Sequence, residues 1–177
     1  MDKKEVETLL QDVKSGDPSA AESLYRLLMP KLYVVAYAVL KDSFLAEDVA
    51  HETYIQVYNR IDTYTFTGDA CACICTIAYN RALNCLSKLK RENSVDVQVH
   101  MQCADSSLPL DERIQQKEVL AEALATLSEE EQYIVLWHVR GGLKHREIAK
   151  ILHMPLNTVL SKYRRSLKKL RLYLDGQ

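Results

Sequence analysis

The stretch GLKHREIAKILHMPLNTVLSKYRRSLKKLR, residues 142–171, has the pattern of two helices joined by a tight turn. Between residues 139 and 172, lysine and arginine occur ten times against the single acid Glu147. Apolar residues recur on the second helix at the spacing that packs one helix face onto its neighbours: Leu156, Val159, Tyr163, Leu167 and Leu170. The opposite face is therefore polar and basic. This arrangement is typical of a helix-turn-helix whose second helix enters the major groove of DNA.

The first turns of the basic helix carry side chains suited to reading base edges. Asparagine and arginine make paired hydrogen bonds to adenine and guanine, and the N-terminal residues of a recognition helix are those that reach the bases. The predicted base contacts are Asn157, Thr158, Ser161, Lys162 and Arg165, and the predicted phosphate contacts are Lys168 and Lys169. The alternative is a solvated surface helix, whose cations are favourable near its C-terminus. The net charge of the whole chain is only −1, so the basic character belongs to this segment alone.

The composition indicates a folded, helical protein. Of 177 residues 47% are hydrophobic, and glycine and proline are few. The longest apolar run, residues 32–40, is too short to span a membrane and is followed by Lys41 and Asp42. The first residues are charged, which argues against secretion, and five cysteines suit a reducing compartment better than a disulfide framework. We therefore expect a cytoplasmic protein without a membrane span.

Residues 93–112 divide the chain. They contain no lysine or arginine, lose the helical spacing and include Pro109, which together indicate an acidic, flexible linker. We expect an all-α fold with two small helical domains, residues 1–92 and 113–177, and the helix-turn-helix in the second. Because each domain is small, the two halves are expected to support each other or to need a partner.

Local signals predict several helix ends. Asp17 before Pro18 predicts an N-cap followed by a first-turn proline, and Pro30 is expected to kink or interrupt the helix that contains it. Ser128 and Glu131 have the spacing of a capping box.

The segment at residues 142–171 resembles the promoter-binding C-terminal domain of sigma-70 family RNA polymerase sigma factors of the extracytoplasmic-function type. Upstream, LAEDVAHETYIQVY, residues 45–58, is similar to the family segment that docks on the clamp helices of the polymerase large subunit. The resemblance implies a factor that binds core RNA polymerase and directs promoter-specific initiation. Its C-terminal helix would read the minus-35 element of double-stranded promoter DNA, and its N-terminal domain would engage the melted minus-10 strand. An anti-sigma factor is a further partner that the resemblance allows.

The segment at residues 45–58 has a packed side and an acidic side. Opposite the apolar positions, the acidic side carries Glu47, Asp48, His51 and Glu52. The resemblance assigns Asp48, His51 and Glu52 to polymerase contact, with His51 standing where the family usually has glutamine. The alternative is again a plain solvated face, because exposed acids are common.

Residues 60–92 resemble the family segment that captures unpaired minus-10 bases and melts the duplex. The residues expected to contact this strand are Tyr64, Phe66, Asn80, Asn84, Lys88 and Arg91. The sequence departs from the family pattern at Ala70 and Cys73, where aromatic residues are usual, and at Asn84, where aspartate is usual. Because strand capture relies on aromatic stacking, we expect weaker intrinsic melting than in a typical relative, or reliance on an activator.

Cys71, Cys73 and Cys75 invite a metal or redox interpretation, with Cys85, His100 and Cys103 as further ligands. Their spacing matches no common zinc arrangement, so buried small side chains are the preferred interpretation. We predict no metal and no cofactor. The sequence shows no nucleophile with a base and no phosphate loop, so an enzyme is not expected. The competing function is a stand-alone helix-turn-helix regulator that does not bind polymerase, for which the acidic helix would be superfluous.

Overall fold

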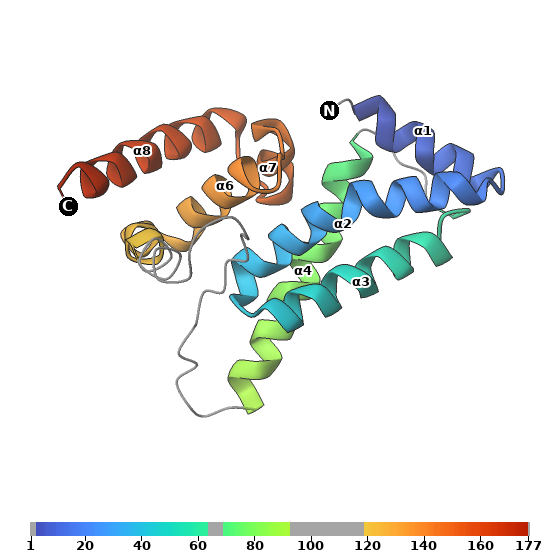
Figure 1. The fold of residues 1–177 in the computed structure, drawn as a ribbon, viewed down its shortest axis with the longest axis horizontal. Coiled ribbons are helices and arrows are strands. Elements are labelled where there is room, and N and C mark those ends of the chain that lie inside the picture. The colour runs from blue at the N-terminus through green and yellow to red at the C-terminus, as the bar shows by residue number, and fades with distance from the viewer. Residues whose placement is uncertain (1–2, 64–68, 93–118, 177) are drawn as a thin grey trace, which may run out of the picture.

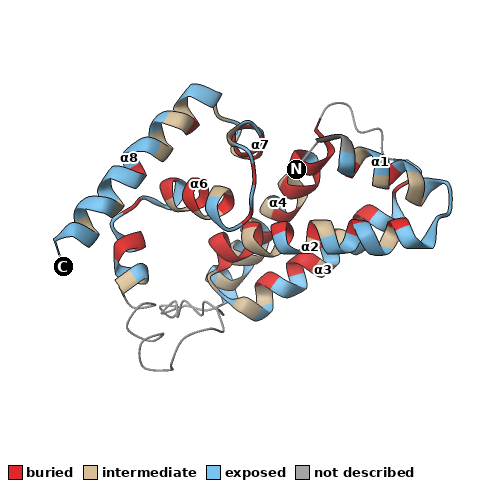
Figure 2. Cartoon of the chain, turned by 45° about the horizontal axis from the view of Figure 1, so that its top comes forward, coloured by how far each residue is buried: buried red, intermediate tan, exposed pale blue. Residues whose placement is uncertain are grey.

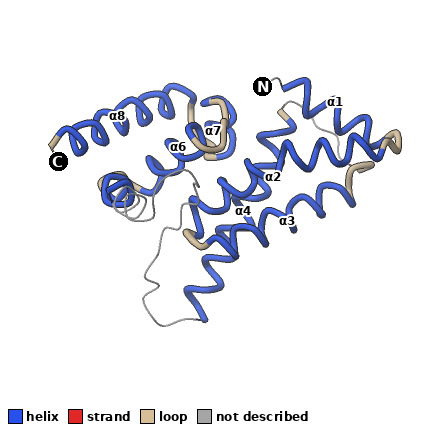
Figure 3. The backbone as a smooth tube through the Cα atoms, viewed as in Figure 1, coloured by secondary structure: helices blue, strands red, loops and turns tan. Residues whose placement is uncertain are grey.

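The computed structural model describes residues 3–63, 69–92 and 119–176, and every regular element in these ranges is a helix (Figures 1 and 3). Residues 119–125 are also helical. The labelled helices are α1 (Lys3–Lys14), α2 (Pro18–Leu40), α3 (Ser43–Asn59), α4 (Ala70–Glu92), α6 (Glu129–Val139), α7 (His145–Ile151) and α8 (Leu156–Asp175). The all-α prediction is confirmed. The predicted linker at residues 93–112 lies outside the described residues, as do Tyr64 and Phe66.

The predicted helix caps are present. The Asp17 carboxylate accepts from the Ser19 amide at 2.8 Å ahead of Pro18. Ser128 and Glu131 form the reciprocal capping box that opens α6. The expectation for Pro30 was wrong in one respect, because α2 continues as one helix through it to Leu40. Burial of this helix on several sides compensates for the hydrogen bond that a proline cannot donate.

Helix α2 forms the centre of the N-terminal half. It packs against α1, α3 and α4, and Leu24, Leu28, Leu32 and Val35 on it are fully buried. By length and composition alone α2 is apolar enough to cross a membrane, yet half of its most apolar window is buried within the fold. A core helix meets the same criteria, and the contacts of α2 are those of a core helix.

The two halves share one hydrophobic core. Helix α6 packs on α2 and α7 packs on α4, and Figure 2 shows buried positions gathered where these helices meet. The core cluster runs from Leu28 and Ile74 in the N-terminal half to Trp137 and Ile148 in the C-terminal half. The two halves therefore contact each other through buried side chains, which is one of the two arrangements expected from their small size.

Helices α6, α7 and α8 build the C-terminal half. The turn between α7 and α8 passes through His153, whose φ of 52° lies in the left-handed region. Histidine adopts this conformation more readily than most residues, although glycine does so at lower cost. Gly142, with a φ of 62°, makes the corresponding reversal between α6 and α7.

Candidate functional site

Helix α8 presents its predicted DNA face outward. Val159 is fully buried on its inner side, whereas Asn157, Ser161, Arg165 and Lys168 are exposed. Thr158 is half-buried. Asn157 and Ser161 therefore lie one helical turn apart on a solvent-facing surface, in the geometry that base reading from the start of a recognition helix requires.

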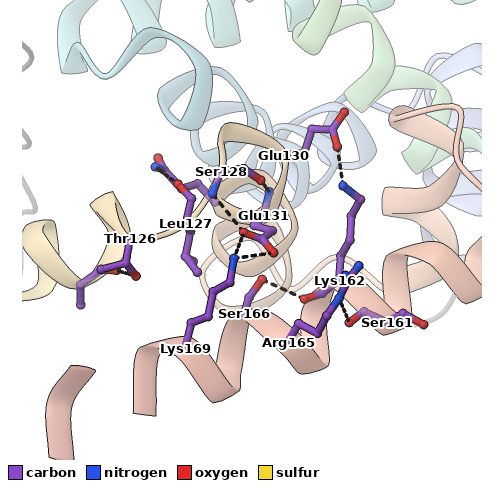
Figure 4. A network of polar contacts seen from close by, with 12 residues as sticks. Thr126, Leu127, Ser128, Glu130, Glu131, Ser161, Lys162, Arg165, Ser166 and Lys169 are labelled. Carbon is purple, nitrogen blue, oxygen red and sulfur yellow. Dashed lines mark hydrogen bonds and ion pairs between the residues drawn. The ribbon is translucent and has the colours of Figure 1, made fainter. Parts of the chain in front are cut away.

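Two of the predicted DNA-contacting lysines already have partners on α6 (Figure 4). Lys162 Nζ donates to Glu130 Oε2 at 2.6 Å, and Lys169 Nζ donates to Glu131 Oε2 at 2.8 Å. Burial raises the pKa of Glu131, but hydrogen bonds from Lys169 and Ser128 outweigh burial and leave this pKa below its usual value. The carboxylate of Glu131 therefore stays ionised and ties α8 to the capping box of α6.

Three aromatic rings fix the inner face of α8. Tyr163 meets His138 of α6 edge-on at a centroid distance of 5.0 Å and His145 of α7 at 4.7 Å. Burial and the neighbouring His138 lower the pKa of His145, so His145 is neutral at pH 7. This cluster holds α6, α7 and α8 in register, which fixes the direction of the predicted DNA face.

Further cations lie on the same half. Arg146 of α7 and Arg164 of α8 are exposed, and the sequence interpretation did not include them among the contacts. Both arginines belong to the basic stretch of the sequence, which could have drawn attention to them. Charge alone, however, does not show which cations lie on the same helix face as Asn157. Arg171 is paired with Asp175 at 3.4 Å within α8.

On α4 the predicted minus-10 residues form one exposed surface: Asn80, Asn84, Lys88 and Arg91. Arg81, in contrast, is directed toward α3, where its guanidinium donates to Gln56 and Glu52. Cys73 is exposed nearer the start of α4. The described part of this surface is therefore amide-rich and basic, and it carries no aromatic side chain at position 73.

The acidic face of α3 has the predicted orientation. Ala46, Val49, Ala50, Thr53 and Val57 are buried, and Asp48 is exposed on the opposite side. His51 is half-buried, with its Nε2 3.8 Å from Glu47 and its ring 6.0 Å from the Tyr25 ring. Glu52 is exposed but bonded to Arg81, so it has an intramolecular partner that the sequence did not reveal.

Two apolar side chains on this face were missed by the sequence interpretation. Phe44 is 78% exposed and Ile55 is 55% exposed. At spacings of four and seven residues from Asp48, both fall on the same helical line as this carboxylate. This helical spacing could have identified both residues from the sequence alone. The outer face of α3 therefore combines a carboxylate with two large apolar groups, as a protein-docking surface does.

The cysteines of α4 do not form a metal site among the described residues, where no cluster of three or more potential ligands occurs. Cys71 and Cys75 are buried. A hydrogen bond with Cys71 and burial raise the pKa of the Cys75 thiol well above its usual value. A protonated, buried thiol acts as a small apolar group. His100 and Cys103 lie outside the described residues.

Comparison with known proteins agrees with this arrangement. A family model described as sigma-70 region 2 matches residues 24–92, and one described as sigma-70, region 4, matches residues 117–170. The extracytoplasmic-function (ECF) RNA polymerase sigma factor SigW of Bacillus subtilis is 24% identical over 173 residues, 92% of each chain. SigK of Mycobacterium ulcerans, also an ECF sigma factor, is 26% identical over 181 residues, covering 97% of this chain and 95% of SigK.

Two solved structures share the fold. CnrH in complex with the cytosolic domain of CnrY matches with a TM-score of 0.68 at 18% identity, over 99% of both chains. The sigma factor RpoE in complex with the anti-sigma factor NepR from Bartonella quintana matches with a TM-score of 0.65 at 19% identity, over 87% of this chain and 96% of RpoE. The chain therefore belongs to the sigma-70 family of RNA polymerase sigma factors, in its extracytoplasmic-function group.

Proposed function

We propose that this sigma factor divides promoter recognition between its two halves. Residues 1–92 dock on core RNA polymerase through α3 and engage the minus-10 element through α4. Residues 113–177 read the minus-35 element through α8, and residues 93–112 link them. The observation that carries this proposal is the presence of two chemically opposite exposed faces on one chain, the acidic and apolar face of α3 and the basic face of α8.

On α3 the proposed polymerase contacts are Asp48, His51 and Glu52, supplemented by Phe44 and Ile55. An acidic face flanked by apolar groups fits a basic helical surface on the polymerase, because opposite charges orient the encounter and apolar burial stabilises the complex. A regulator that bound only DNA would have no use for such a face. This is the reason to prefer an initiation factor over a stand-alone regulator.

On α8 the proposed base contacts are Asn157, Thr158, Ser161, Lys162 and Arg165, with Lys168 and Lys169 on phosphates. Lys162 and Lys169 must leave their α6 carboxylates when DNA binds, Lys162 for a base edge and Lys169 for a phosphate oxygen. On α4 the proposed contacts with the melted minus-10 DNA strand are Asn80, Asn84, Lys88 and Arg91. Tyr64 and Phe66 are proposed as further contacts with this DNA strand.

We assign no catalytic step and no cofactor to the chain, which acts with polymerase and DNA in the cytoplasm. The two structural relatives named above are each in complex with another protein, and that of RpoE is an anti-sigma factor. A similar inhibitory partner is proposed for this chain.

Run-off transcription with purified core polymerase and a promoter library tests the function directly. We expect transcripts only from promoters that share a minus-35 and a minus-10 sequence. A matched variant with Asn157→Ala and Arg165→Ala should still bind polymerase but lose about 10-fold or more in preference at the minus-35 positions. If the wild-type chain binds these promoters but does not retain core polymerase in a pull-down, the stand-alone regulator is correct instead.

Promoter melting should improve when an aromatic ring is supplied on α4. Cys73→Trp adds a stacking surface at an exposed position, and one stacked base contributes about 1–3 kcal/mol. We expect the open complex to live about 5-fold longer or more, measured as resistance to a heparin challenge. Cys73→Leu enlarges the apolar side chain without an aromatic face and serves as the control. An unchanged open-complex lifetime in Cys73→Trp would show that the missing aromatic ring is not the cause of the expected weak melting.

A further inference from the structure

The inner side of α8 determines where its outer side points. Val159 and Ser166 are fully buried, and Tyr163 between them packs on the rings of α6 and α7. These three positions follow one another at intervals of four and three residues, which is the spacing of one line along a helix. Because each residue turns an α-helix by about 100°, the opposite line is offset from this one by about two residues.

The opposite line consists of exposed positions and includes an arginine. It runs through Asn157, Ser161, Arg164 and Lys168, again at intervals of four, three and four residues. Asn157 and Ser161 already belong to the proposed minus-35 contacts, and Arg164 follows Ser161 on the same line. Arg165, one residue later, is rotated by about 100° from Arg164 and lies on the flank of the helix.

The neighbouring cations of α8 have partners within the chain, whereas Arg164 has none. Figure 4 shows Lys162 and Lys169 bonded to carboxylates of α6. Arg165 Nε donates back to the Ser161 carbonyl at 3.4 Å. Arg164 makes no hydrogen bond or ion pair with any described residue. Its guanidinium therefore leaves no internal partner when it enters a groove, and all five of its N–H groups are available to DNA.

We propose that Arg164 is a base-reading residue of α8 and selects a guanine in the minus-35 element. This inference rests on the proposed function and adds a contact to it. The guanidinium can donate two hydrogen bonds to O6 and N7 on the major-groove edge of guanine. Guanine is the base that presents two adjacent acceptors on this edge, so the paired contact distinguishes it from the other three bases.

The place of Arg164 on the helix favours a base over a phosphate. A recognition helix in the major groove presents its outermost line to the base edges, while its flanks face the two phosphate backbones. Arg164 lies on this outermost line in the third turn of α8, and its long side chain adds to its reach. Lys169 lies on a flank beside α6, where its proposed contact is a phosphate.

The same line predicts the spacing of the bases that it reads. Arg164 is seven residues beyond Asn157, which corresponds to about 10 Å along a helix that rises about 1.5 Å per residue. Bases on one strand of a duplex are about 3.4 Å apart, so this distance spans about two to three base pairs. With adenine read by Asn157, we expect promoters that place a G·C pair about two to three base pairs from an A·T pair.

Substitutions at position 164 separate base reading from phosphate binding. The full-length chain is assembled with core polymerase, and run-off transcription is measured on promoters randomised across the minus-35 region. Arg164→Ala should lose about 10-fold in preference for guanine at one base pair, with preference at the minus-10 element unchanged. Arg164→Gln should shift the preference at that base pair toward adenine, because glutamine pairs with the N6 and N7 edge of adenine.

Lys168→Ala is the matched control, because Lys168 is exposed on the same line and is proposed to contact phosphate. It should weaken binding to all sequences by a similar factor and leave base preference unchanged. The same uniform loss in Arg164→Ala would overturn the proposal, since it would make Arg164 a phosphate contact.

A change of one atom in the DNA gives a readout that does not depend on the stability of α8. Replacing the selected guanine by 7-deazaguanine removes its N7 acceptor, so the wild-type holoenzyme should bind about 5-fold more weakly or worse. The Arg164→Ala holoenzyme should bind both duplexes equally. An equal loss in wild type and variant would contradict the assignment. If the wild type initiates with core polymerase at no promoter, or shows no minus-35 preference, the proposed function fails and the assignment fails with it.

Discussion

Reversing the charge of α3 by Asp48→Lys with Glu52→Lys is expected to abolish binding of core polymerase. Asp48 is exposed at the centre of the proposed docking face, beside Phe44 and Ile55. A lysine there faces a basic partner, and juxtaposed like charges cost several kcal/mol, which corresponds to about 100-fold or more in affinity. Binding is measured by titrating labelled core enzyme, and transcription should fall in parallel.

The single variants separate two effects at this face. Glu52→Lys also places a cation beside Arg81, so it loosens the contact between α3 and α4 as well as changing the outer face. Asp48→Lys changes only the outer face and should account for most of the loss. Glu22→Lys on the exposed side of α2 is the matched control, since it reverses an exposed acid that, like Glu52, is paired with an arginine. Polymerase binding that survives in the double variant would show that another surface docks.

Trp137→Ala is expected to destabilise the whole chain rather than the C-terminal half alone. The side chain is fully buried between Tyr79 of α4 and Tyr133 of α6. Truncating a buried tryptophan costs about 3–5 kcal/mol, which is a large share of the stability of a domain. Urea unfolding followed by far-ultraviolet circular dichroism should show the midpoint shift to a lower concentration.

The number of urea-unfolding transitions shows whether the two halves unfold together or independently. With one shared core, wild type should unfold in a single transition, and Trp137→Ala should lower its midpoint or split it in two. Trp137→Phe retains an aromatic ring and should lose less stability. Two wild-type transitions, of which the variant shifts only one, would mean that the halves unfold independently.

Features that depend on local sequence were predictable in advance. The caps at Asp17 and Ser128 depend on side chains within three residues, and the polar face of α8 depends on helical periodicity. For the same reason the exposed faces of α3 and α4 had their predicted orientations.

Features that depend on contacts between distant segments were not predictable. Nothing in the neighbourhood of Arg81 indicates that its guanidinium would be bound by Glu52 and Gln56. The continuity of α2 through Pro30 depends on helices that pack around it. The partners of Lys162 and Lys169 lie 32 and 38 residues away, so helical spacing identified their face but not their ion pairs.

With Lys169 on a phosphate as proposed, its ion pair with Glu131 has a consequence for how the protein searches a genome. The Glu131 carboxylate already accepts from the Lys169 ammonium, so a DNA phosphate must compete with this carboxylate for the lysine. The cost of that competition is the same on every sequence, whereas the gain from base pairs that fit Asn157 and Arg165 is not. The pair therefore reduces adhesion to random DNA and leaves the choice of binding site to the bases.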